Sequence, residues 1–174
     1  MNQQIWEKAV DFHGHECPGL AIGVRASQVA TELLGLQFSE DEEVVCVTEN
    51  DACGLDGVQV LMGCSFGKGN LLYHGTGKQA FSFFERKSGK EIRLVLKQFT
   101  GEMSRTERMN YILDASVDDV FTIGKPRHAL PEKARLFKTV QCQLCGEGAP
   151  EHKMRLQDGK TVCLDCFNAY DRGF

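Results

Sequence analysis

Two pairs of cysteines near the C-terminus constrain the fold of this chain more than any other feature. Each pair has two residues between its members, and seventeen residues separate Cys142 and Cys145 from Cys163 and Cys166. This spacing is typical of a structural zinc site. A pair of redox motifs is the alternative, but a segment of this size buries too little apolar surface to fold without a metal. We therefore predict one zinc ion held by four thiolates.

The residues around these cysteines predict the local fold of the tail. Gly146 follows the first pair and favours a tight knuckle, and Asp158-Gly159 is a strong hairpin signal. Residues 167–174 are expected to form a short helix after the last ligand. Knuckle, hairpin and helix together indicate a treble-clef zinc finger. Four thiolates leave no open coordination position, so the expected role of this zinc is structural.

Length and composition set the remaining limits. The chain has 174 residues, of which 42% are hydrophobic and 25% charged, and its net charge is −4. These are ordinary values for a globular domain with a small appendage. The acidic balance makes nucleic acid an unlikely partner class, since phosphate-backbone binders carry an excess of Lys and Arg. No apolar run is long enough to span a membrane, and no signal peptide is visible at the N-terminus.

We therefore expect a cytoplasmic protein whose eight cysteines are kept reduced and serve as metal ligands or redox groups. The sequence pattern predicts an α+β core domain over 1–126, a mixed β-sheet flanked by helices. A basic, proline-containing linker over 127–138 and the zinc finger over 139–174 follow. The predicted helices of the core are 1–12, 18–34, 54–62 and 104–114, and the predicted strands are 42–50, 71–75, 79–86 and 91–99.

The other four cysteines are scattered, and their neighbours indicate different roles. Cys17 precedes Pro18 at the start of a predicted helix, where the helix dipole favours thiolate. Cys53 lies just past a predicted strand, and Cys64 directly follows the glycine that ends the next helix. Cys46 lies inside a strand and is expected to be a buried core thiol.

Two histidines precede Cys17, and the three side chains would point the same way in an extended segment. Such soft ligands at element ends could converge on an open transition-metal site, with an aspartate orienting a histidine. The same thiols could instead pack as small hydrophobes. A third interpretation is a redox dithiol, or Cys17 as a nucleophile with a histidine as its base. The residues concerned are His13, His15, Cys17, Cys53 and Cys64, with Asp51 and Asp56 as the aspartates.

The glycine-rich segment Gly67-Lys68-Gly69 resembles a phosphate loop only superficially. It lacks the glycine spacing and the final hydroxyl residue of a P-loop. We interpret it as a turn, with a role for Lys68 in holding an anionic ligand left open.

Several motifs together resemble the FmdE family, which is named for a component of formylmethanofuran dehydrogenase. They are HGHECPG (13–19), the run ENDACGLDGVQVLMGCSFGKGNL (49–71) and the stretch GTGKQAF (75–81). The VQCQLCGE segment (140–147) with its second cysteine pair is similar to the zinc-finger extension of many members. The resemblance covers nearly the whole chain.

The resemblance implies a thioredoxin-like α+β core, a treble-clef zinc finger and a homodimer. It also implies a metal-binding pocket in the core, with zinc as the first candidate, whose ligands correspond to His15, Cys17, Cys53 and Cys64 in this sequence. His13 would then stand behind the ligands. Cys17 and His15 are the candidate catalytic residues.

Three functions remain open at this stage. The first is an enzyme or an oxidoreductase subunit linked to molybdenum or tungsten formylmethanofuran dehydrogenases of one-carbon metabolism, as the resemblance implies. The second is a non-catalytic protein that delivers metal to such an oxidoreductase or docks onto it. The third and weakest is a zinc-finger regulator, because the chain lacks a basic, aromatic stripe for nucleic acid.

Overall fold

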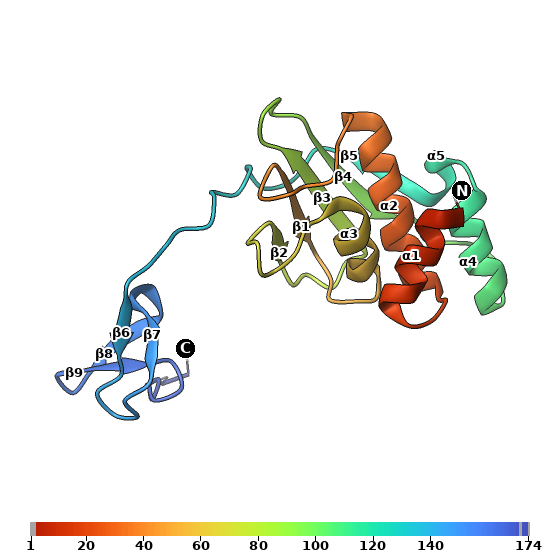
Figure 1. The fold of residues 1–174 in the computed structure, drawn as a ribbon. Helices are drawn as coiled ribbons and strands as arrows, with labels where there is room; N and C mark the ends of the chain where they lie inside the picture. Colours follow the sequence, from red (N-terminus) through yellow and green to blue (C-terminus); the bar gives the residue numbers. More distant parts are fainter. Residues whose placement is uncertain (1–2, 171, 174) are drawn as a thin grey trace. The chain divides into compact units, whose positions relative to one another are not determined.

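A computed structural model describes residues 3–170 and 172–173 of the chain. It divides into two compact units, Met1–Ala134 and Arg135–Phe174, which are described separately below. Figure 1 shows both units.

The larger unit is built on a five-stranded mixed sheet with the order β2-β1-β3-β4-β5. β1 pairs in parallel with β2, whereas the β1–β3, β3–β4 and β4–β5 pairs are antiparallel. The strands are β1 (Val44–Thr48), β2 (Leu71–Tyr73), β3 (Ala80–Glu85), β4 (Glu91–Leu96) and β5 (Phe121–Gly124). The expected α+β class with a mixed sheet is confirmed. β5 was not predicted, because its FTIG segment is short and runs into the proline-containing stretch.

Helices cover one face of this sheet (Figure 1). The central helix α2 is buried along most of its length, and Phe81, Phe83 and Leu94 from the sheet contribute to the same core. The capping box predicted at Ser104 and Glu107 is present at the start of α4. The helices are α1 (Gln3–His13), α2 (Pro18–Leu34), α3 (Gly54–Met62), α4 (Arg105–Asp114) and α5 (Val117–Val120).

Glycines let α2 and α3 approach each other at backbone distance. A Cβ atom at Gly23 would lie 1.8 Å from the carbonyl oxygen of Gly54, and one at Gly57 would lie 2.6 Å from the backbone nitrogen of Val24. Real side chains do not tolerate such distances, so only glycine fits at Gly23 and Gly57. This close crossing brings the N-terminal ends of both helices together.

The opposite face of the sheet carries a smaller apolar cluster of Val45, Val47 and Phe84. The chain after β5 crosses from that edge strand toward β2, where the His128 and His74 rings meet with centroids 4.4 Å apart. Arg86 donates to the carbonyl oxygen of Pro131. Arg86 also pairs with Glu42, whose carboxylate accepts the Ala134 N–H.

These contacts attach the first part of the predicted linker to the larger unit. Residues 127–134 therefore belong structurally with the core, and the smaller unit begins at Arg135.

The smaller unit consists of two hairpins and a short 3-10 turn. β6 (Thr139–Gln141) pairs with β7 (Gly148–Pro150), and β8 (Met154–Gln157) pairs with β9 (Lys160–Cys163), with η1 (Glu151–Lys153) between the hairpins. The predicted Asp-Gly turn is confirmed, since Asp158 and Gly159 both have positive φ, 50° and 74°.

The helix predicted over 167–174 differs from the structure. Residues 167–170 and 172–173 are not helical, and Asp171 and Phe174 lie outside the described residues. Gln157 instead binds the backbone of Asn168 through both its amide atoms, which holds this segment against the second hairpin.

Within residues 3–170 and 172–173, the structure has no helix with the length and apolar character needed to span a bilayer.

Candidate metal centres

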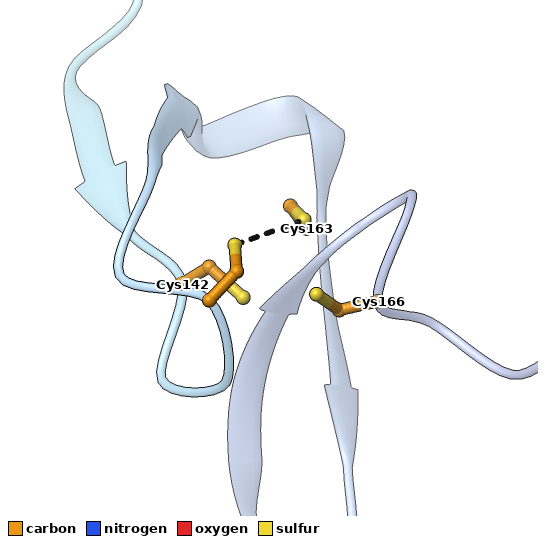
Figure 2. A group of neighbouring side chains, drawn as sticks. Cys142, Cys163 and Cys166 are labelled. Atoms are coloured by element: carbon orange, nitrogen blue, oxygen red, sulfur yellow. Dashed lines mark hydrogen bonds between the residues drawn. The ribbon is translucent and has the colours of Figure 1, made fainter.

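The four tail cysteines converge on one point, as predicted. Their ligand atoms, the sulfurs of Cys142, Cys145, Cys163 and Cys166, all lie within 4.8 Å of one another. Figure 2 shows the sulfurs of Cys142, Cys163 and Cys166 directed into the same space between the knuckle and the hairpin. The Sγ atoms of Cys145 and Cys163 are 3.9 Å apart. Tetrahedral Zn–S bonds of about 2.3 Å require an S···S separation of roughly 3.8 Å, so the arrangement fits zinc.

Backbone geometry prepares this site. The Gly146 N–H donates to the Cys142 carbonyl oxygen, with Gly146 at a φ of 79°, and the Leu144 N–H points at the Cys142 sulfur at 3.4 Å. Backbone N–H groups lower the pKa of the Cys142 thiol to about 6. The nearby sulfurs raise the pKa of Cys166 to about 12. A divalent cation resolves this conflict between neighbouring thiolates.

A second group of ligand atoms lies in the larger unit, and it consists of His13, Cys17 and Cys53. These three atoms also lie within 4.8 Å of one another, and the His13 Nε2 atom is 3.7 Å from the Cys17 sulfur. A zinc ion bound by nitrogen and sulfur at its usual bond lengths needs roughly 3.6 Å between them. The group therefore also fits a metal, with three protein ligands rather than four.

Three helix ends supply the three ligands. His13 is the last residue of α1, and Gly14, with a φ of 89°, turns the chain toward α2. Cys17 is extended and caps α2, where its sulfur accepts the Leu20 N–H at 3.2 Å. Cys53 occupies the equivalent position before α3 but makes no side-chain cap. The predicted capping role of Cys17 is confirmed.

Asp56 fixes the orientation of His13. Its carboxylate lies 2.6 Å from His13 Nδ1, and Gln59 donates to its other oxygen. This leaves Nε2 of His13 facing the two sulfurs, the arrangement in which a carboxylate orients a metal-binding imidazole. The hydrogen bond to Asp56 is the main reason that the pKa of His13 is raised.

The two thiols of this group differ electrostatically. Burial opposes ionisation of Cys17, but the Leu20 N–H and His13 outweigh it and lower the pKa of Cys17. Burial and the neighbouring Cys17 sulfur raise the pKa of Cys53. Cys17 is therefore the group most readily present as a thiolate.

Cys64 lies outside this group. It is fully buried, and its thiol donates to the Val44 carbonyl oxygen at 3.6 Å. Burial raises its pKa to about 12. Cys64 therefore packs in the interior near Cys46, whose predicted burial in the core is confirmed.

His15 is exposed in the turn between α1 and α2, and its ring contacts that of His13 with centroids 4.5 Å apart. It is not among the three clustered ligands, so a ligand or catalytic role for His15 stays a prediction. Of the two predicted aspartates, Asp56 and not Asp51 contacts His13.

Lys68 has a structural role in the loop before β1. Its ammonium group donates to the carbonyl oxygens of Ser39 and Glu40. The anion-binding role considered for Lys68 is therefore replaced by a contact that fixes this loop.

Sequence reasoning placed His13 behind the ligands, whereas the structure puts it directly beside both sulfurs. A signal for the convergence was present in the glycines at 19 and 23 and at 54 and 57. Small residues at helical spacing in two segments predict a close helix crossing, and here that crossing places Cys17 beside Cys53.

Comparisons with known proteins agree with this division. Residues 12–123 match the family described as "FmdE, Molybdenum formylmethanofuran dehydrogenase operon". Residues 135–172 match the "Prokaryotic dksA/traR C4-type zinc finger".

Two relatives are similar over most of this chain. A protein of Archaeoglobus fulgidus, described as a probable S-adenosyl-L-methionine-binding protein, is 32% identical over 197 aligned positions, which cover 94% of this chain. The chain spans about half of that relative, 52% of its length. The crystal structure of an FmdE-like protein of tungsten formylmethanofuran dehydrogenase from Syntrophus aciditrophicus is 25% identical, with a TM-score of 0.68. That match covers 94% of this chain and 90% of the other.

The matching region contains His13, Cys17, Cys53 and Asp56, and it makes up more than half of the chain. The chain therefore belongs to the FmdE family and carries a C-terminal four-cysteine zinc finger.

Proposed function

We propose that the larger unit binds a transition metal, with zinc as the first candidate, through His13, Cys17 and Cys53. The observation that carries this proposal is the meeting of three ligand atoms from three helix ends, with Asp56 holding the imidazole. Three protein ligands leave a fourth position for an exchangeable molecule, in contrast to the closed tail site.

Each residue has a distinct task in this site. Asp56 holds the proton on Nδ1 of His13, which leaves Nε2 free to bind, and the Leu20 N–H favours thiolate at Cys17. A bound zinc ion would supply Lewis acidity toward a small oxygen or nitrogen ligand. Cys17 is the candidate reactive thiolate if the metal is absent or exchanges.

The proposed cellular role is in one-carbon metabolism connected with molybdenum or tungsten formylmethanofuran dehydrogenases. The family description and the description of the Syntrophus aciditrophicus protein support this link. The chain would act there as an enzyme or as part of an oxidoreductase, in the form of a homodimer. A non-catalytic protein that delivers metal or docks onto the oxidoreductase is the alternative. Recovery of oxidoreductase subunits with the tagged protein from an anaerobic host is expected for either role, and recovery of the homodimer alone would contradict both.

Metal analysis of matched variants tests the core site directly. We expect two zinc ions per wild-type chain, and one in His13→Ala or Cys53→Ser. His15→Ala and Cys64→Ser are the matched controls, because they remove the same atom types next to the site, and both should retain two zinc ions. A double variant of Cys142 and Cys145 should lose only the tail zinc.

Two results would refute the proposal. One is a single zinc ion in the wild-type chain that disappears with the tail cysteines. The other is loss of the second ion in Cys64→Ser but not in Cys53→Ser.

The Archaeoglobus fulgidus relative suggests S-adenosyl-L-methionine as a second candidate ligand, since the alignment covers 94% of this chain. Calorimetric titration of the zinc-loaded protein with S-adenosyl-L-methionine tests it. The absence of heat at millimolar ligand would dispose of this candidate.

A further inference from the structure

A cavity of about 680 Å³ opens beside the core metal group. Its walls come from the start of α2, the end of β4 and the segment after it, the residues just before β3, and α4. This size lies within the range of pockets that hold small organic ligands.

The charged side chains in the cavity wall are cationic. Lys78, Lys97 and Arg108 line it, and none of the described lining residues carries a carboxylate side chain. Lys97 already donates to the carbonyl oxygen of Asp118. Among the described residues, Lys78 and Arg108 have no ion-pair partner. An anionic group in the cavity would provide one.

The remaining wall is largely apolar. Ile22, Phe99 and Ile112 line the cavity, and Ile112 is fully buried. The Phe99 ring packs edge-on against Tyr111 with centroids 5.2 Å apart, which fixes its position. The cavity therefore matches a ligand with an apolar body and a charged end.

Gly19 connects the cavity to the metal group. It lines the cavity, and a Cβ atom at this position would lie 3.5 Å from the Cys53 sulfur and 3.7 Å from the Cys17 sulfur. One residue without a side chain thus separates the two sites. A ligand in the cavity can reach the edge of the thiol pair.

We propose that this cavity binds an organic anion with an apolar or aromatic body. Its carboxylate or phosphate group would pair with Lys78, Lys97 and Arg108, and its other end would lie toward Cys17 and Cys53. The inference rests on the proposed function, because it makes the cavity the place where the substrate of the core site is held.

A matched pair of fluorescent probes tests the charge preference. 1-Anilinonaphthalene-8-sulfonate has an aromatic body and one negative charge, whereas N-phenyl-1-naphthylamine has nearly the same body and none. We expect the anionic probe to bind the zinc-loaded full chain at least tenfold more tightly than the neutral probe. Lys78→Gln/Arg108→Gln should reduce binding of the anionic probe about tenfold and leave the neutral probe unchanged.

The control variant is Lys8→Gln/Arg105→Gln, which removes the same two charges from the larger unit away from the cavity, one of them on α4 itself. It should leave both affinities unchanged. Equal binding of the two probes, or equal losses in the two double variants, would overturn the proposal. Displacement of the anionic probe by S-adenosyl-L-methionine, which is positively charged overall, would also overturn it. Displacement by phenyl phosphate or by phenylacetate assigns the anionic group as phosphate or carboxylate.

Cobalt loading tests the position of the probe, since Co²⁺ quenches a nearby fluorophore and Zn²⁺ does not. We expect stronger quenching in the Co²⁺-loaded wild type than in Co²⁺-loaded Cys53→Ser, which keeps only the tail ion. Equal quenching in both would place the probe away from the core group. Failure of the metal proposal is recognised separately, because Lys78→Gln/Arg108→Gln should retain two zinc ions whatever its probe affinity.

Discussion

The two metal centres use the same kind of ligand to opposite ends. In the tail, four cysteines meet in a unit whose buried apolar cluster consists of Val162 and two of the ligands themselves, Cys142 and Cys163. In the larger unit, two cysteines and a histidine meet at the rim of a core built around α2 and the sheet. The tail is organised around its metal, whereas the larger unit positions its candidate metal site with a fold that is already complete.

This difference assigns the two sites different roles. A unit without a sizeable core depends on its ligands to fold, and four ligands close the site to other molecules. A unit with its own core can leave a position open, because its stability does not depend on the metal. The contrast predicts how each unit responds when metal, packing or charge is changed.

Metal removal should produce the largest effect, and only in the tail. Chelation of zinc should unfold residues 139–166, because apparent binding energies of structural zinc are about 10 kcal/mol or more. Amide hydrogen exchange of the full chain measures this, with rapid exchange expected in β6 to β9 and continued protection in α2 and β3. Persistent protection of the tail in excess chelator would break the comparison.

A change at the helix crossing should give the next largest effect, in the larger unit. Gly23→Ala places a Cβ atom 1.8 Å from the Gly54 carbonyl oxygen, so we expect a loss of about 3 kcal/mol or more in unfolding free energy. Gly67→Ala is the control, since nothing lies within 4 Å of its Cβ position. Chemical denaturation of both variants measures the difference. Similar stabilities would mean that the two helices do not cross as described.

The pH dependence of the larger unit should reflect a buried ion pair. Glu49 bonds Arg93 at 2.6 Å and accepts from the Thr76 hydroxyl. Burial opposes its ionisation, but these partners outweigh it and lower the pKa of Glu49. Because the folded pKa is the lower one, the stabilisation is complete above the ordinary value of 4.5 and is lost as pH falls through the folded pKa.

Acid titration of Glu49→Gln should therefore show a shallower loss of stability below pH 4.5 than the wild type. Its stability near neutral pH should be lower by about 2 kcal/mol, since Arg93 loses its charged partner. Lys87→Gln, an exposed change in the β3–β4 turn, should leave the titration curve unchanged. Parallel curves for Glu49→Gln and the wild type would contradict this assignment.

The smallest effect is expected from the core ligands themselves. Cys53→Ser should change the unfolding free energy of the larger unit by less than about 1 kcal/mol, since Cys53 is only partly buried and caps no helix. Cys163→Ser should unfold the tail under the same conditions. Thermal unfolding monitored separately in each unit distinguishes the two, and comparable losses would remove the distinction between the sites.

The tail and much of the core were predictable from local patterns. The spacing of the cysteine pairs, the Asp158-Gly159 turn and the capping role of Cys17 depend on neighbours within a few residues. The helix expected at the C-terminus was not found in the described residues, because short segments there bind the hairpin instead.

The core ligand set needed three-dimensional information. Whether His13 or His15 faces Cys17 depends on where α1 ends and on Asp56, which lies 43 residues away from His13. Cys64 resembled Cys53 in sequence, since both follow element ends, but it points into the interior toward Val44. These outcomes depend on how α1 and α3 pack, which the spacing of the cysteines does not encode.

Anomalous scattering at the zinc edge, from crystals of the zinc-loaded full chain, would reveal both metal centres in one measurement. We predict two peaks per chain, one among the four tail sulfurs and one within bonding distance of His13 Nε2 and the sulfurs of Cys17 and Cys53. A single peak in the tail, or a second peak bound to Cys64, would contradict the presence of an open metal site in the larger unit.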